Sequence, residues 1–313
     1  MAHDLASPAV APNVPVRLPL WRRVFLGPVR LRAGWRLLLF TGLLTAIGVL
    51  AKLVFDLFRR EGPGWTPLSF VIDEPITLAI GLAATWVMSR IDRLPFAVFG
   101  IVWRDAFRAR FWEGSLWGLV AVVLLVGAIA LGGGYHLRGL ALRGPDLARM
   151  TAVWLAGMML LGLSEEVMFR GYALAALADG MRFWPAAALL SIQFALVHYF
   201  GKPMENLADA LSVGLLGLFL CFTIRRTGSL WFAIGFHFAF DLAALSVFGA
   251  PNTGNDGKPI PGHLLDGTFS GPDWLTGGVR GVEASWLVFP VIAALFVFFH
   301  LRHRETRFPV AHA

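Results

Sequence analysis

Long apolar runs are the feature that most restricts the folds open to this chain, because eight of them approach the length that crosses a lipid bilayer. A helix needs about 20 apolar residues to span the hydrocarbon core, and in lipid its backbone polar groups must be satisfied within the helix itself. We therefore expect an all-α, polytopic membrane protein whose transmembrane helices form one bundle. The expected spans are residues 35–58, 75–88 with a few flanking residues, 114–131, 150–178, 184–200, 207–224, 229–248 and 285–301.

Composition supports the membrane class. The chain is 57% hydrophobic, whereas soluble domains are about 45–50% apolar. With the amino terminus inside, the segments expected to be cytoplasmic hold more than twice as many Lys and Arg residues as the external ones. This asymmetry predicts that both termini are cytoplasmic, so we assign the net charge of +7 to membrane topology and expect no nucleic-acid partner. The single cysteine, Cys221, excludes an internal disulfide and a cysteine-based metal cluster.

The order of charged, apolar and Gly/Pro-rich stretches divides the chain into five parts. The basic arm could lie on lipid headgroups or be a plain unstructured tail, and in the Gly/Pro-rich loop we favour a solvated connector over a lid. The expected parts are a cytoplasmic basic arm (1–34), three N-terminal transmembrane helices (35–148), a core with ionisable residues in its apolar runs (149–248), an external Gly/Pro-rich loop (249–284), and a last transmembrane helix with a basic tail (285–313).

Three of the apolar runs contain ionisable side chains that lipid disfavours. Glu165 and Glu166 lie in one run, His198 in the next, and His237 and Asp241, four residues apart on one helix face, in a third. Even low estimates put a charged side chain at the centre of a membrane helix at about 2.5–3.5 kcal/mol, so such residues face the interior of the bundle. We therefore expect these five side chains to converge from three helices.

Two kinds of hydrolytic chemistry could use this set. A carboxylate and an imidazole can take a proton from water while a second polar pair stabilises the developing oxyanion. Alternatively, two His and one or more carboxylates can form a zinc site with an open position for water. The Glu166–Arg170 pair, one helical turn apart, fits a supporting ion pair.

Depth in the membrane complicates this convergence. Glu165 lies roughly 22 Å from the outer end of its run at 1.5 Å per residue, whereas His198 lies a few residues from the outer end of its own. The two side chains must meet for the chemistry, so we expect tilted or staggered helices, or different helix boundaries.

The three sets together form a recognisable pattern. The motifs Glu165-Glu166-x-x-x-Arg170, Phe194-x-x-x-His198 and His237-x-x-x-Asp241 resemble the three-motif signature of the CAAX-protease and bacteriocin-processing family of intramembrane endopeptidases, which includes the Ras-converting prenyl-protein proteases. The resemblance covers residues 150–248.

This resemblance implies a membrane-embedded peptidase with an eight-helix core. Glu165 would activate water, His198 would assist it, and His237 with the residue four positions later would stabilise the oxyanion; Glu166, Arg170 and Phe194 would shape the site. The resemblance is compatible with a metal-free glutamate protease and with a zinc enzyme. In the zinc enzyme, Glu165, His198, His237 and Asp241 would be the metal ligands.

Asp241 departs from the family pattern, because the prenyl-protein enzymes have Asn at this position. An ionised Asp has no proton to donate to an oxyanion. We therefore expect Asp241 to be protonated, to orient His237, or to bind a cation.

The expected function is hydrolysis of peptide bonds in a protein or peptide substrate, prenylated or not, with membrane lipids as the other partner. A non-catalytic membrane scaffold of the same fold is the first alternative. An ion-coupled transporter is the second, although it predicts repeated halves, and the sequence shows no repeat.

Overall fold

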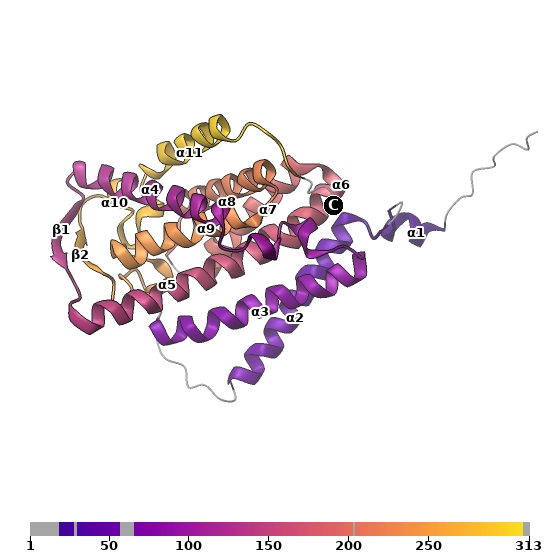
Figure 1. Cartoon of the computed structure of the whole chain (residues 1–313), viewed down its shortest axis with the longest axis horizontal. Helices are drawn as coiled ribbons and strands as arrows, with labels where there is room; N and C mark the ends of the chain where they lie inside the picture. Colours follow the sequence, from indigo (N-terminus) through magenta and orange to yellow (C-terminus); the bar gives the residue numbers. More distant parts are fainter. Residues whose placement is uncertain (1–18, 28–29, 57–65, 203, 309–313) are drawn as a thin grey trace, which may run out of the picture.

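The computed structural model describes residues 19–27, 30–56, 66–202 and 204–308. Most of the expected basic arm and the end of the tail (309–313) lie outside these residues. The described part is an all-α bundle of long helices with one small sheet at one end (Figure 1). Seven of its helical segments are long and apolar enough to cross a membrane, so the protein is an integral, multi-pass membrane protein.

The helices follow the expected order with different bounds. The expected 75–88 span begins earlier, at Pro67, and the last expected span is a helix of only 15 residues, shorter than the other seven. The helices are α1 Leu20–Phe25, α2 Ala33–Asp56, α3 Pro67–Asp92, α4 Ala109–Leu131, α5 Gly144–Glu166, α6 Tyr172–Met181, α7 Phe183–Gly201, α8 Leu207–Thr227, α9 Leu230–Asp241, α10 Asp273–Thr276 and α11 Val288–Arg302.

Two π-helical turns interrupt the core helices. The turn Val167–Gly171 joins α5 to α6, so that Gly144–Met181 is one helical segment of 38 residues. The turn Leu242–Val247 extends α9. Glu165 therefore lies inside a segment longer than a bilayer span, and such a segment can tilt in the membrane, as expected if Glu165 and His198 are to meet.

Glycines bring α4 and α9 into backbone contact. A Cβ atom on Gly114 would overlap the carbonyl oxygen of Phe232, and one on Gly235 would overlap that of Phe111. Small residues permit this close approach between membrane helices, where van der Waals packing drives association. The contact fixes the position of α9, which carries His237 and Asp241.

The segment 249–284, called the roof segment below, differs from the solvated connector that its composition favours. Its strand β2 (Leu265–Phe269) pairs antiparallel with β1 (Tyr135–Leu140), which follows α4. Ala250 and Ile260 are fully buried, because these apolar side chains pack onto the bundle. The roof segment therefore covers one end of the bundle.

A buried charge cluster joins the N-terminal helices to α6. The Arg36 guanidinium lies 2.6 Å from an Asp92 oxygen and 2.8 Å from Asp179. The Tyr172 hydroxyl donates to the same Asp92 oxygen at 2.7 Å and accepts from Arg36 Nε at 3.2 Å. We call these four residues the Arg36 cluster. Arg36 lies at the start of the first expected span (35–58), and no pattern in the sequence predicted this cluster.

Candidate active site

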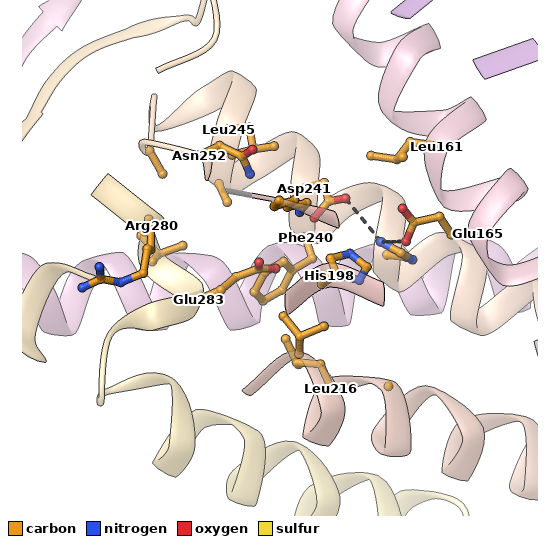
Figure 2. Close-up of a pocket in the computed structure, with 18 of the residues that line it drawn as sticks. Leu161, Glu165, His198, Leu216, Phe240, Asp241, Leu245, Asn252, Arg280 and Glu283 are labelled. Carbon is orange, nitrogen blue, oxygen red and sulfur yellow. Dashed lines mark ion pairs between the residues drawn. The ribbon is translucent and has the colours of Figure 1, made fainter. Parts of the chain in front are cut away.

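One pocket, between α5, α7, α8, α9 and the roof segment, brings together residues from all three motifs. Glu165, His198, His237 and Asp241 all line it, and Figure 2 shows Glu165, His198 and Asp241 around the same space. The cavity has a volume of about 100 Å³, which is room for several water molecules. The expected convergence from three helices is thus present in the structure.

Local helix geometry presents the site carboxylates to this pocket. Glu165 and Glu166 end α5 directly before one π turn, and Asp241 ends α9 directly before the other. Such turns insert an extra residue into the helical repeat and occur frequently at functional sites. On α5, a Cβ at Gly162 would lie 3.0 Å from the backbone nitrogen of Phe238, so a glycine lets α5 approach α9 here.

Glu166 is the buried centre of the site. Its Oε1 accepts a hydrogen bond from Arg170 Nη1 at 2.8 Å and lies 2.9 Å from His237 Nδ1. The side chains of Glu166 and Arg170 are 0% and 1% exposed. The Arg170 guanidinium packs 4.1 Å above the Phe194 ring, and a Cβ at Gly217 would lie 2.7 Å from Arg170 Nη2. Glu166 and Arg170 therefore lie behind His237, whereas Phe194 lines the pocket.

His237 is surrounded by carboxylates. Besides the contact of Nδ1 with Glu166, its Nε2 lies 3.3 Å from Asp241 Oδ2 and 3.7 Å from Glu165 Oε2. A ring whose two nitrogens face carboxylate oxygens acts as a hydrogen-bond donor. Among the three roles considered for Asp241, this geometry favours orientation of His237.

In contrast to His237, His198 has a hydrogen-bond contact at one ring nitrogen, and that contact is with a carbonyl oxygen. Its Nδ1 lies 2.9 Å from the carbonyl oxygen of Phe194, an acceptor that assigns the proton to Nδ1 and leaves Nε2 unprotonated. The Phe194 ring also packs 4.3 Å from the His198 ring. His198 is therefore held with a basic nitrogen available for proton transfer.

Glu74 lies behind Glu165 and was missed because it stands at the edge of an expected span. Its Oε2 accepts a hydrogen bond from the hydroxyl of Ser164 at 3.0 Å. Ser164 immediately precedes Glu165, so α3 also contributes a carboxylate near the site.

The pocket contains further polar residues that sequence reasoning did not predict: Lys202, Asn252, Arg280 and Glu283. Lys202 follows His198 by one helical turn, and this spacing could have revealed it. Glu283 comes from the irregular roof segment, where no periodicity signals its direction. Burial and the nearby charge of Asp241 raise the pKa of Glu283 to about 7.

Polar contacts fasten the roof segment to α8. Arg280 forms ion pairs with Asp209 of α8 at 3.4 Å and with Asp273 at 2.6 Å. The hydroxyl of Ser212 donates to the Glu283 carbonyl at 2.7 Å. In Figure 2 the Arg280 side chain extends away from Glu165 and His198. Arg280 therefore serves as an anchor of the roof.

The candidate residues do not fit a metal ion in this arrangement. Across the described residues, no group of three or more His, Cys, Asp and Glu side chains is placed to hold one. Both nitrogens of His237 face carboxylates, and Nδ1 of His198 faces a carbonyl. The expectation of a metalloendopeptidase thus receives no support, and we derive no catalytic step through zinc.

Fold and pocket together define an all-α, multi-pass membrane protein with a polar pocket between its spans. Residues 147–243 match the family model described as type II CAAX prenyl endopeptidase Rce1-like. This segment holds all three motifs, so the resemblance to the CAAX-protease family is confirmed over this region. No curated protein matches the chain. The family supports a CAAX-type protease in general terms.

Proposed function

We propose that this protein is an intramembrane endopeptidase that hydrolyses peptide bonds near the carboxyl terminus of a membrane-associated protein or peptide. The observation that carries the proposal is the single pocket lined by Glu165, His198, His237 and Asp241 from α5, α7 and α9. The family model is described as a type II CAAX prenyl endopeptidase, and from this name we take a prenylated CAAX sequence as the proposed substrate class.

In the proposed mechanism, a water molecule in the pocket attacks the carbonyl carbon of the scissile peptide bond. Glu165 takes a proton from this water, and the His198 nitrogen Nε2 assists as a second base. The carbonyl oxygen becomes an oxyanion, which accepts a hydrogen bond from the Nε2–H group of His237, shared with Asp241. The carbon–nitrogen bond then breaks, and the proton moves from Glu165 to the leaving amine, so the carboxylate is regenerated.

The supporting residues act through His237 in this proposal. Asp241 at 3.3 Å and Glu166 at 2.9 Å fix the orientation of the ring. Arg170 offsets the charge of Glu166. Because Glu166 and Arg170 lie behind His237, they do not contact the substrate.

Cleavage of a synthetic CAAX peptide by the detergent-purified protein tests the proposal, with farnesylated and unmodified forms compared. We expect Glu165→Gln and His198→Ala to abolish cleavage while the thermal unfolding midpoint stays near that of the wild type. Asp146→Asn is the matched control, because it removes one negative charge from an exposed position of the same helix, α5. Wild-type rates in both site variants would overturn the assignment, and no cleavage by the wild type on either peptide would favour the scaffold alternative.

Chelation tests the metal-free mechanism separately. Cleavage should survive dialysis against a strong chelator, and the purified protein should hold less than one zinc per chain. Activity that is lost on chelation and restored by zinc would contradict this mechanism without affecting the proposed substrate class.

A further inference from the structure

A lipid-facing groove runs between α4 and α11, on helices that do not contribute to the catalytic pocket. Its volume is about 610 Å³. Leu116, Val120 and Leu124 of α4 line one side, and Val291, Ala294 and Phe298 of α11 line the other. Several of these side chains are more than half exposed, including Leu116, Leu124 and Phe298. The groove is therefore apolar and open to the bilayer.

A cationic pocket of about 390 Å³ lies where the same two helices meet. The start of α4 adjoins the end of α11, and the two are joined by a contact of 3.0 Å between His303 Nε2 and Glu113 Oε1. The pocket is lined by five arginines: Arg110, Arg226, Arg302, Arg304 and Arg307. They come from α4, α8, α11 and the tail.

The central arginine of this pocket has no carboxylate partner within the part of the chain that the structure describes. The Arg226 guanidinium contacts only neutral acceptors: the Arg304 carbonyl at 2.6 Å, the Thr306 hydroxyl at 3.3 Å and His300 Nδ1 at 2.9 Å. Its Nε is buried without a hydrogen bond. A partly buried charge without a counter-charge is costly, so the site favours an anion.

The carboxylates nearby are already engaged. Glu113 is shared by Arg110 at 2.9 Å and His303, and Glu305 is paired with Arg307 at 2.9 Å. Five arginines thus face two glutamates, and positive charge remains in excess. Arginine binds phosphate well because its planar guanidinium offers paired donors.

The groove and the pocket are continuous along both helices. Phe298 of the groove precedes Arg302 of the pocket by one helical turn, about 6 Å, and Arg110 precedes Leu116 by about 9 Å. A single ligand can therefore occupy both. We propose that this site binds an anionic phospholipid, with its phosphate among the five arginines and one acyl chain along the α4–α11 groove.

This assignment is specific to the pocket around Arg226. A second pocket lined by Arg30, Arg36 and Arg225 also contains Asp179, and Arg36 is ion-paired with Asp92 and Asp179. Internal carboxylates offset the charge there. The pocket around Arg226 combines excess charge with an adjoining apolar groove.

Binding to the delipidated full-length protein in detergent tests the proposal, with phosphatidylglycerol and phosphatidylcholine of identical chains as probes. We expect phosphatidylglycerol to bind at least about tenfold more tightly, as charge-assisted hydrogen bonds allow, and to raise the thermal unfolding midpoint. Arg302→Gln with Arg304→Gln should remove this preference; both side chains are exposed, so folding should be retained. The matched control is Arg143→Gln with Arg149→Gln, an equal charge loss at exposed positions at the other end of the bundle.

Further measurements distinguish a bound phospholipid from free phosphate and from a farnesylated peptide. Ala294→Trp should weaken phosphatidylglycerol binding by filling the groove. Equal binding of the two lipids, or an unchanged preference in the Arg302/Arg304 variant, would overturn the proposal. It would also be overturned if inorganic phosphate stabilised the protein as well as phosphatidylglycerol does, or if a farnesylated peptide displaced the lipid from the groove.

Discussion

Two clusters of buried charge lie in this bundle, and they differ in how completely their atoms are paired. In the Arg36 cluster, Arg36, Asp92 and Tyr172 contact one another at 2.6–3.2 Å, and within the described residues none of their buried nitrogens and oxygens lacks a hydrogen bond. At the candidate active site, Glu165 Oε2, Glu166 Oε2 and Arg170 Nη2 are buried with no hydrogen-bond partner among the residues that the structure describes.

This difference separates structural from catalytic use of buried charge. A satisfied network rigidifies a fold, and the Arg36 cluster holds α2 and α3 against α6. Unsatisfied buried atoms are rare in native proteins and call for an explanation. Of the three residues only Glu165 lines the pocket, and in the proposed mechanism water supplies its missing partner. Mutations at the candidate active site should therefore mainly lower activity, whereas mutations in the Arg36 cluster should mainly lower stability.

The largest effect on activity is expected for Glu165→Gln. The substitution keeps the size of the side chain but removes the base that accepts the proton of water, and loss of a general base costs about 10²–10⁴ in rate. Cleavage of the CAAX peptide should fall by at least about a hundredfold, with an unchanged unfolding midpoint. If the unfolding midpoint fell together with the cleavage rate, Glu165 would have a structural role.

The largest effect on stability is expected for Asp92→Ala. It leaves Arg36 buried with a single remaining ion pair, to the exposed Asp179, and breaking a buried pair costs about 3–5 kcal/mol. Chemical unfolding in detergent micelles would measure the loss, and activity per folded molecule should stay at the wild-type value. Lost activity in the molecules that remain folded would contradict a purely structural role.

Glu166→Gln should lie between these extremes, because Glu166 supports the site from a fully buried position. The amide oxygen can still accept from His237, but the charge opposite Arg170 is lost, which costs about 1.5–3 kcal/mol. We expect lower stability together with a rate reduction of roughly tenfold or more, measured on the same preparation. An effect on stability alone would give Glu166 a purely structural role, and an effect on the cleavage rate alone would give it a purely catalytic one.

Asp241→Asn should have a smaller effect on cleavage. If Asp241 orients His237 across 3.3 Å, the amide oxygen can take over as acceptor, and the rate should stay within about tenfold of the wild type. This change also restores the residue that the prenyl-protein enzymes carry. A loss beyond a hundredfold would mean that the negative charge itself is required.

The smallest expected effect is that of Glu283 on the pH dependence of stability. Burial and Asp241 raise its pKa from 4.5 to about 7, while Lys202 and His237 act in the opposite direction and Glu205 in the same one. Between these two pKa values the folded state therefore binds more protons than the unfolded state. The contribution of Glu283 to stability is full below pH 4.5 and is lost as the pH rises to 7.

Glu283→Gln should remove this component of the pH dependence. The unfolding midpoint of the variant should decline less between pH 5 and 7 than that of the wild type, and at pH 8 the variant should be the more stable protein. Asp256→Asn, at an exposed position of the roof segment, is the control. Identical pH profiles for wild type and Glu283→Gln would show that Glu283 titrates normally.

Much of this architecture could be predicted from the pattern of apolar and charged residues in the sequence. Runs of apolar residues predicted the membrane helices, and the penalty for charge in lipid predicted that Glu165, His198 and Asp241 face one interior space. These inferences succeed because helical spacing and lipid solvation are local properties. The length of α11 was harder to predict, since the residues before Val288 are equally apolar but fold as a turn.

Contacts between distant segments could not be predicted in the same way. Arg36 looked like a flanking charge because its partner Asp92 is remote in sequence. Glu283 reaches the pocket only because β2 and the Arg280 ion pairs fix the path of an irregular segment. The π turns after Glu166 and Asp241 have no compositional signature. Each of these features depends on packing rather than on the residues next to it.

The roof segment has a consequence for substrate access in the proposed enzyme. It lines the pocket together with α5, α7, α8 and α9, and the Arg280–Asp209 ion pair holds it against α8. A substrate that enters the pocket from this end must displace the roof, so its access would depend on the strength of that contact.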